Sequence, residues 1–133
     1  MAYDQSTTDT VRIPDTTTLS VEGGVLHWKN EDFFISVEEA REIKAQVQRE
    51  LDQVEGVLVD NAEASGTWPI ETDEVWGELM ETIYRQGVQC ATVAASATNA
   101  MHVNRLSKDN GTYDLIRAFK PDEREEALEF ASA

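Results

Sequence analysis

The chain has 133 residues, 41% of them apolar, which fits one domain with a single hydrophobic core. Its 26 acidic residues exceed its 11 basic residues and give a formal net charge of −15, so we expect no nucleic-acid partner. No segment approaches the ~20 consecutive apolar residues of a membrane-spanning helix, and no apolar leader occurs near Met1, so we expect a cytoplasmic protein without membrane insertion.

The first thirty residues predict a disordered segment and then a hairpin. Met1–Thr10 is rich in Ser, Thr and Asp, so we expect disorder there and a single domain over residues 11–133. Apolar residues alternate weakly over Val11–Val21, and Val25–Lys29 is typical of a returning strand. Gly23-Gly24 between them supplies the positive φ angles of a tight hairpin turn.

Helix–strand units follow the hairpin. Ser36-Val37-Glu38-Glu39 is a capping box before apolar residues at spacings of three and four, and Gly56 is expected to end that helix. We expect Thr72 to cap the second helix and Ser96 or Thr98 the third. The predicted elements are, in chain order, a helix over Ser36–Gly56, a strand at Val57–Asp60, a helix over Thr72–Gly87, a strand at Val88–Ala94, a helix up to Asn110-Gly111, a strand at Tyr113–Phe119 and a helix over Pro121–Ala131. This order predicts one α/β domain with a mixed five-stranded sheet and about four helices.

The predicted helices carry like charges one turn apart. The pairs at i,i+4 spacing are Glu38–Glu42, Glu74–Glu78, Asp122–Glu126 and Glu125–Glu129. Each pair destabilises its helix by a few tenths of a kcal/mol in dilute salt, and molar salt screens this repulsion. The pattern indicates a halophilic protein adapted to a salt-rich cytoplasm, with a merely acidic mesophilic protein as the alternative.

A candidate binding surface is expected beyond the carboxyl ends of two neighbouring strands. Function in parallel α/β sheets is found at these ends, where loops emerge and helix N-termini direct unpaired amides. Contact should centre on the loop 61–72 and on residues 96–99. The side chains expected to contribute are Asp60, Asn61, Ser65, Thr67, Trp68, Thr72, Ser96, Thr98 and Asn99.

Few residues offer catalytic chemistry. Asp60 could act as an acid–base group or orient a ligand, but capping of loop amides at the strand end is the favoured interpretation. Trp68 could contact a partner or fold back over the core. Cys90 lies in an apolar strand and is expected to be a core residue, while His27 and His102 lack metal-ligand spacing. We therefore predict no catalytic set, no metal and no cofactor.

The pattern from about Thr17 to Ala131 resembles the STAS superfamily, and most of all small single-domain proteins similar to sporulation anti-anti-sigma factors. The resemblance is carried by Ser36–Ile43 opening the first helix, the strand Gly56–Asp60, Arg85–Val88 leading into the next strand, and Tyr113–Phe119 before an acidic terminal helix. It implies a regulatory domain that binds proteins. A homodimer through Val25–Lys29 is also expected, because an uncovered edge strand tends to pair.

The chain departs from this family at the start of the second helix. Phosphoswitching members have Asp-Ser-Ser-Gly there, whereas this chain has Ile70-Glu71-Thr72-Asp73-Glu74. Thr72 is the single hydroxyl, and acids surround it, so a phosphate of charge about −2 would be poorly tolerated. Alternatively, Glu71 and Asp73 imitate a phosphorylated state. We expect a non-enzymatic regulatory or protein-interaction domain, with a small-molecule or lipid-binding domain and an enzyme using Asp60 as alternatives.

Overall fold

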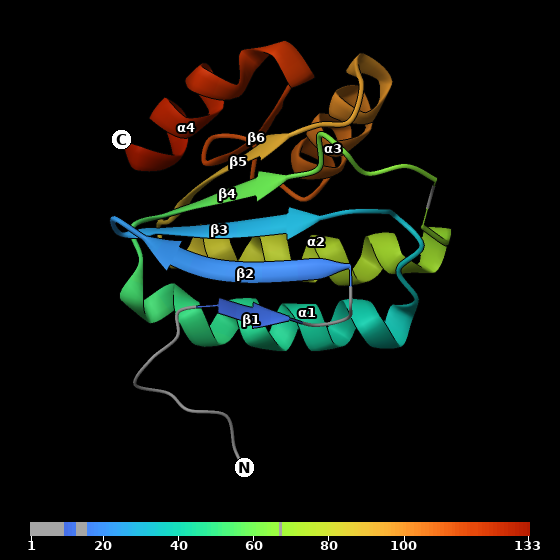
Figure 1. Cartoon of the computed structure of the whole chain (residues 1–133), viewed down its shortest axis with the longest axis horizontal. Helices are drawn as coiled ribbons and strands as arrows, with labels where there is room; N and C mark the ends of the chain where they lie inside the picture. The colour runs from blue at the N-terminus through green and yellow to red at the C-terminus, as the bar shows by residue number, and fades with distance from the viewer. Residues whose placement is uncertain (1–9, 13–15, 67) are drawn as a thin grey trace.

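A six-stranded sheet forms the centre of the computed structural model, which describes residues 10–12, 16–66 and 68–133 (Figure 1). The strands lie side by side in the order of the chain. They are β1 (Thr10–Arg12), β2 (Thr17–Glu22), β3 (Val25–Asn30), β4 (Gly56–Asp60), β5 (Gln89–Val93) and β6 (Ile116–Phe119). β1, β2 and β3 pair antiparallel, and β3 to β6 pair parallel. The carboxyl ends of β3 to β6 therefore meet at one edge.

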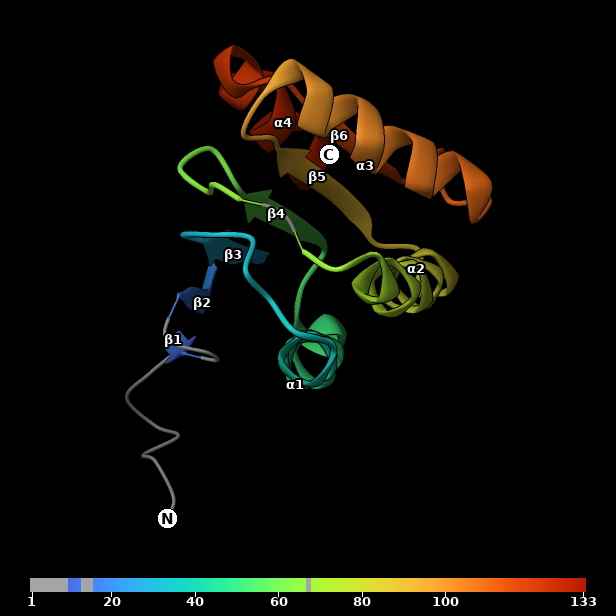
Figure 2. The same cartoon turned by 90° about the vertical axis from the view of Figure 1, so that its right-hand side faces the viewer.

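Three helices connect the parallel strands, and they lie on one face of the sheet. These are α1 (Val37–Glu50), α2 (Ile70–Arg85) and α3 (Ala97–Asp109). Right-handed crossovers in sequential order place successive helices on the same side. Figure 2 shows α1, α2 and α3 along one side and α4 (Arg124–Ser132) on the other. The main core lies between the sheet and the first three helices, and a smaller apolar cluster packs under α4.

The predicted α/β fold is confirmed. The five predicted strands are present as β2 to β6, and β1 adds a short sixth strand at the edge. Ser36 caps α1, with reciprocal hydrogen bonds to Glu39 of 3.1 and 3.0 Å. Of the segment predicted to be disordered, Met1–Thr10, only Thr10 is described, and it begins β1.

Two local predictions are wrong. α1 ends at Glu50 and a 3-10 turn follows, so Gly56 does not end the helix but opens β4. A glycine is needed there because α4 packs against this strand: a Cβ on Gly56 would meet the backbone oxygen of Ala131. Val25–Lys29 is not an edge, because β3 is hydrogen-bonded to β2 and to β4. Dimerisation through that strand therefore has no free edge to use.

Candidate functional site

An open cleft of about 660 Å³ lies at the carboxyl edge of the sheet. The loop after β4, the first turn of α2, and the start of α3 form its walls. The cleft is lined by Phe33, Ala64, Gly66, Trp68, Ile70, Asp73, Ala95, Ser96, Thr98, Asn99 and His102. The two loops that the sequence singled out therefore meet around one hollow, as the parallel strand order requires.

Aromatic rings form the inner wall of the cleft. The ring of Trp68 packs edge-on against Phe33 at 5.0 Å between centroids and against Trp76 at 6.0 Å. Trp76 in turn contacts Trp28, 5.6 Å away, so the row of rings continues into the core. Trp68 is half-buried and packs against the main core cluster. Trp68 therefore folds back over the core, and it also lines the cleft.

A small polar cluster holds Trp68 in place. Its indole Nε1 donates a hydrogen bond to Asp73 Oδ1 at 2.6 Å. The same oxygen lies 3.3 Å from His102 Nε2, and the His102 ring is 6.1 Å from the Trp68 ring. Asp73 is on α2 and His102 on α3, so this cluster joins the two helices across the cleft.

Asp60 has a structural place at the end of β4. Its Oδ1 accepts a hydrogen bond from the backbone amide of Ala62 at 3.1 Å, which is the predicted capping of a loop amide. Its Oδ2 lies 2.9 Å from Arg124 Nη2 on the opposite face of the sheet. Both carboxylate oxygens are engaged, and Asp60 does not line the cleft.

Asn61 is buried instead of exposed on the loop. Its Oδ1 accepts a hydrogen bond from Asn30 Nδ2 at 2.8 Å. Asn30 Oδ1 in turn accepts from Thr17 Oγ1 and from Trp28 Nε1, at 2.9 and 3.1 Å. This buried network ties the ends of β2, β3 and β4 together. Asn61 therefore positions the loop and offers no surface contact.

The prediction that Thr72 caps α2 is wrong. The helix begins at Ile70, and its N-cap is Pro69, three residues before Thr72. Thr72 is fully buried, and its hydroxyl donates a hydrogen bond to the backbone oxygen of Ile35 at 3.2 Å. It anchors the start of α2 to the segment before α1 and is not at the surface of the protein.

The remaining predicted residues lie around the cleft, except Thr67, which is outside the described residues. Ser96 caps α3 and accepts from the amide of Asn99 at 3.0 Å, while Asn99 Oδ1 accepts from the amide of Ala95 at 3.1 Å. Thr98 is exposed in the first turn of α3. The backbone oxygen of Ser65 accepts from the amide of Phe33 at 2.9 Å, which joins the loop after β4 to the loop after β3.

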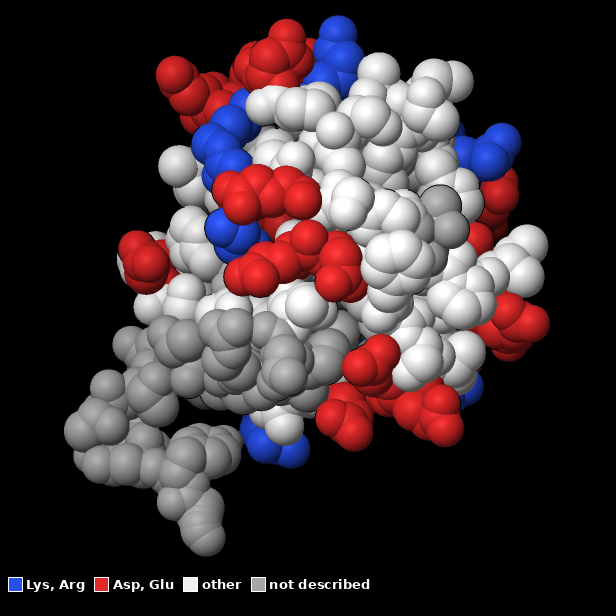
Figure 3. Space-filling view, turned by 45° about the vertical axis from the view of Figure 1, so that its right-hand side comes forward, with Lys and Arg blue, Asp and Glu red and all other residues white. Residues whose placement is uncertain are grey.

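Three exposed apolar side chains lie on the segments that form the cleft. Phe34, Ile70 and Met101 are 71%, 79% and 72% exposed. Ile70 lines the cleft, Phe34 covers Gly66 so closely that a Cβ there would be 2.6 Å from its Cζ, and Met101 precedes His102 on α3. Figure 3 shows a broad area without charged side chains on this side of the molecule, bordered by acidic groups. We call Phe34, Ile70 and Met101 the apolar rim.

Cys90 and the metal-binding types of side chain add no second candidate site among the described residues. Cys90 is buried, and burial raises the pKa of its thiol to about 12, so it is not a thiolate at neutral pH. Within the described ranges, His, Cys, Asp and Glu side chains form no group of three that could hold a metal ion. In the same ranges, no helix has the length and apolar character needed to cross a bilayer.

Three of the residues that line the cleft were not assigned to the binding surface from the sequence. Phe33, Asp73 and His102 come from three separate elements, and their meeting depends on how α2 and α3 pack. One signal was present: His102 follows Thr98 by four residues and Asn99 by three, so all three lie near one another on α3.

No family model and no curated protein matches the sequence. Solved structures match its fold. An uncharacterised protein of the DUF3478 family with a SpoIIAA-like fold, from Shewanella loihica, superposes with a TM-score of 0.62 at 11% identity, over 86% of this chain and 91% of that one. A putative anti-sigma factor antagonist from Thermotoga maritima gives 0.59 at 13% identity, over 86% and 96% of the two chains. The anti-sigma factor antagonist SpoIIAA in its unphosphorylated form gives 0.55 at 9% identity, over 85% and 96%. The chain therefore has the SpoIIAA-like, STAS-type fold.

Proposed function

We propose that the chain is a non-enzymatic regulatory domain that binds a protein partner at the cleft end of the sheet. The apolar rim carries this proposal. Large exposed apolar side chains mark interaction surfaces, and here Ile70 lines the cleft, Phe34 contacts Gly66 of its lining and Met101 is next to His102, on a strongly acidic chain. Two neighbours of the same fold are described as anti-sigma factor antagonists, which supports a protein as the partner.

The polar groups of the site support a binding role over catalysis. Asp60 is engaged on both carboxylate oxygens, and Asp73 Oδ1 is shared between Trp68 and His102. No nucleophile within hydrogen-bond distance of His102 is found in the described part of the chain, so this pair lacks the third member of a catalytic set. These carboxylates hold loops and rings in position.

We propose that binding is not controlled by phosphorylation at the family position. Thr72 is the single hydroxyl there, and it is fully buried with its hydroxyl bonded to Ile35. A phosphate would need this side chain to leave the core, and it would face the exposed carboxylates of Glu71 and Glu74. Regulation of binding by this chain therefore requires a signal other than phosphorylation of Thr72.

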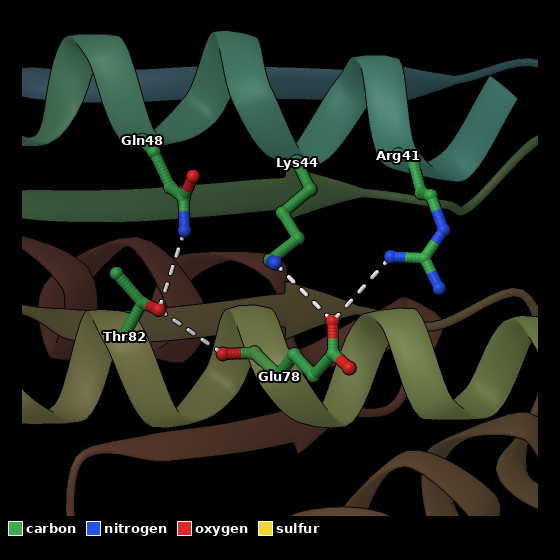
Figure 4. A network of polar contacts seen from close by, with 5 residues as sticks. All are labelled: Arg41, Lys44, Gln48, Glu78 and Thr82. Carbon is green, nitrogen blue, oxygen red and sulfur yellow. Dashed lines mark hydrogen bonds and ion pairs between the residues drawn. The ribbon is translucent and has the colours of Figure 1, made fainter. Parts of the chain in front are cut away.

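Salt adaptation is a further part of the proposal. All eight carboxylates of the i,i+4 pairs lie at exposed positions, where salt screens them. Glu78 differs from the others because it has basic neighbours. Lys44 and Arg41 of α1 approach its Oε1 to 3.2 and 3.7 Å (Figure 4). Among the described side chains, no ion pair offsets the repulsion within the other three pairs, Glu38–Glu42, Asp122–Glu126 and Glu125–Glu129.

We expect the melting temperature to rise as KCl is raised from 0.1 to 2 M. Screening three pairs at a few tenths of a kcal/mol each gives about 1 kcal/mol, which corresponds to a rise of about 3–6 °C for a domain of this size. Differential scanning calorimetry measures this rise. The double variant Glu38→Gln, Glu125→Gln should have a higher melting temperature than the wild type in dilute salt, and its melting temperature should rise less as KCl is added. A flat curve, or an equal gain in the variant, would count against salt adaptation.

Native mass spectrometry of the chain purified from its own host tests the proposed function. We expect a stoichiometric complex with a second protein, in high salt and after gel filtration. If the second protein in the complex is another copy of this chain, the partner is the chain itself. Recovery of the bare monomer alone, from cells in which the chain is expressed at its natural level, would contradict the proposal.

A further inference from the structure

A second, smaller cavity lies behind the cleft. Its volume is about 60 Å³, compared with ~30 Å³ for one water molecule in the liquid. It lies between the sheet, α2 and α3, with Trp28, Trp76, Val103 and Ile116 among its walls. Trp68 lines both this inner cavity and the cleft, so the two spaces meet at this side chain.

The inner cavity has an unpaired hydrogen-bond donor in its wall. Trp76 is 7% exposed, and its Nε1 is buried without any hydrogen-bond partner among the described residues. The other two indole groups are paired, Trp28 with Asn30 at 3.1 Å and Trp68 with Asp73 at 2.6 Å. Buried donors are nearly always paired, because leaving one unpaired costs about 1–3 kcal/mol. An acceptor placed in the cavity would remove this cost.

We propose that cleft and inner cavity together bind a compact, uncharged organic molecule with a mainly apolar body and one hydrogen-bond acceptor at its end. The acceptor receives the hydrogen bond of Trp76 Nε1, and the body lies along Trp68 and Phe33 in the cleft. The cleft volume of about 660 Å³ is within the ~300–1,000 Å³ of small-molecule sites. This site goes beyond the proposed function and does not depend on a protein partner.

Charge and size restrict the ligand. An anion would meet Asp73 and the field of a chain with net charge −15. An ion of either sign would lose its hydration in the inner cavity, where the described side chains include no charged group to pair with it. The inner cavity admits about two water-sized groups, which fits a carbonyl oxygen with one small group beside it and excludes a ring.

Titrations with acetophenone and ethylbenzene test this inference. The two probes share an aromatic body, and only acetophenone has an acceptor. The indole N–H signals of the three tryptophans are followed by NMR in the wild type and in Trp76→Phe, which keeps an aromatic ring and removes the donor. Leu128→Ala, an exposed position of α4, is the matched control.

We expect acetophenone to saturate the wild type and to move the Trp76 indole signal downfield. Its affinity should fall about fivefold in Trp76→Phe, the effect of one hydrogen bond, while ethylbenzene binds both forms equally. Leu128→Ala should bind both probes as the wild type does. Failure of acetophenone to saturate the wild type would overturn the proposal. So would saturation without movement of the Trp76 signal, because the probe would then occupy the cleft alone.

Discussion

Replacing Trp76 with alanine is expected to lower the free energy of unfolding by about 3–5 kcal/mol, the usual cost of removing a large aromatic ring from a core. Trp76 is 7% exposed and packs between Trp28 and Trp68. Its loss would join the inner cavity to a larger void and leave Trp68 without support. Chemical denaturation with urea, followed by circular dichroism, measures the change.

Trp76→Phe provides the control for this prediction. It keeps most of the apolar ring and removes an N–H that has no partner, so the expected loss is well below that of alanine, at about 1–2 kcal/mol. Leu128→Ala, at an exposed position, should change the unfolding free energy by less than about 0.5 kcal/mol. A loss below about 1 kcal/mol in Trp76→Ala would mean that this ring is not part of the main core.

The sequence was sufficient for the order and type of the elements from β2 to α4, whereas β1 was not predicted, because most of these elements rest on local chemistry. The capping box at Ser36, the apolar stripe behind it and the glycine pair of the hairpin depend on neighbours a few residues away. Gly56 shows where local signals fail. The glycine was interpreted as a helix stop, but it is the backbone of Ala131, 75 positions later in the chain (131 − 56), that leaves no room for a side chain there.

The position of the candidate site could be predicted, whereas the roles of its residues could not. Strand order alone brings the loop 61–72 and the start of α3 to one edge. Burial depends on tertiary packing, so Asn61 and Thr72, both polar and both in a loop-like context, gave no sign that they would be buried. Conversely, the pairing of Asp73 with His102 joins residues 29 positions apart and follows from the packing of α2 against α3.

Replacing Ile70 with arginine is the change expected to act most strongly on partner binding. Ile70 is 79% exposed at the first position of α2, so its replacement should leave the unfolding free energy within about 0.5 kcal/mol. At the centre of an interface, an apolar side chain of this kind contributes about 2 kcal/mol or more, which is a loss of about thirtyfold in affinity. Ile70→Ser separates the loss of apolar contact from the added charge.

The dissociation constant of the partner, measured by isothermal titration calorimetry for the wild type, Ile70→Arg and Leu128→Arg, tests the central claim most directly. Leu128 is also an exposed apolar residue, 42% accessible, but it lies on α4 at the opposite face of the sheet. We predict that Ile70→Arg weakens binding by about thirtyfold or more and that Leu128→Arg leaves it unchanged. Unchanged binding in Ile70→Arg together with a loss in Leu128→Arg would contradict the account and place the functional surface on α4.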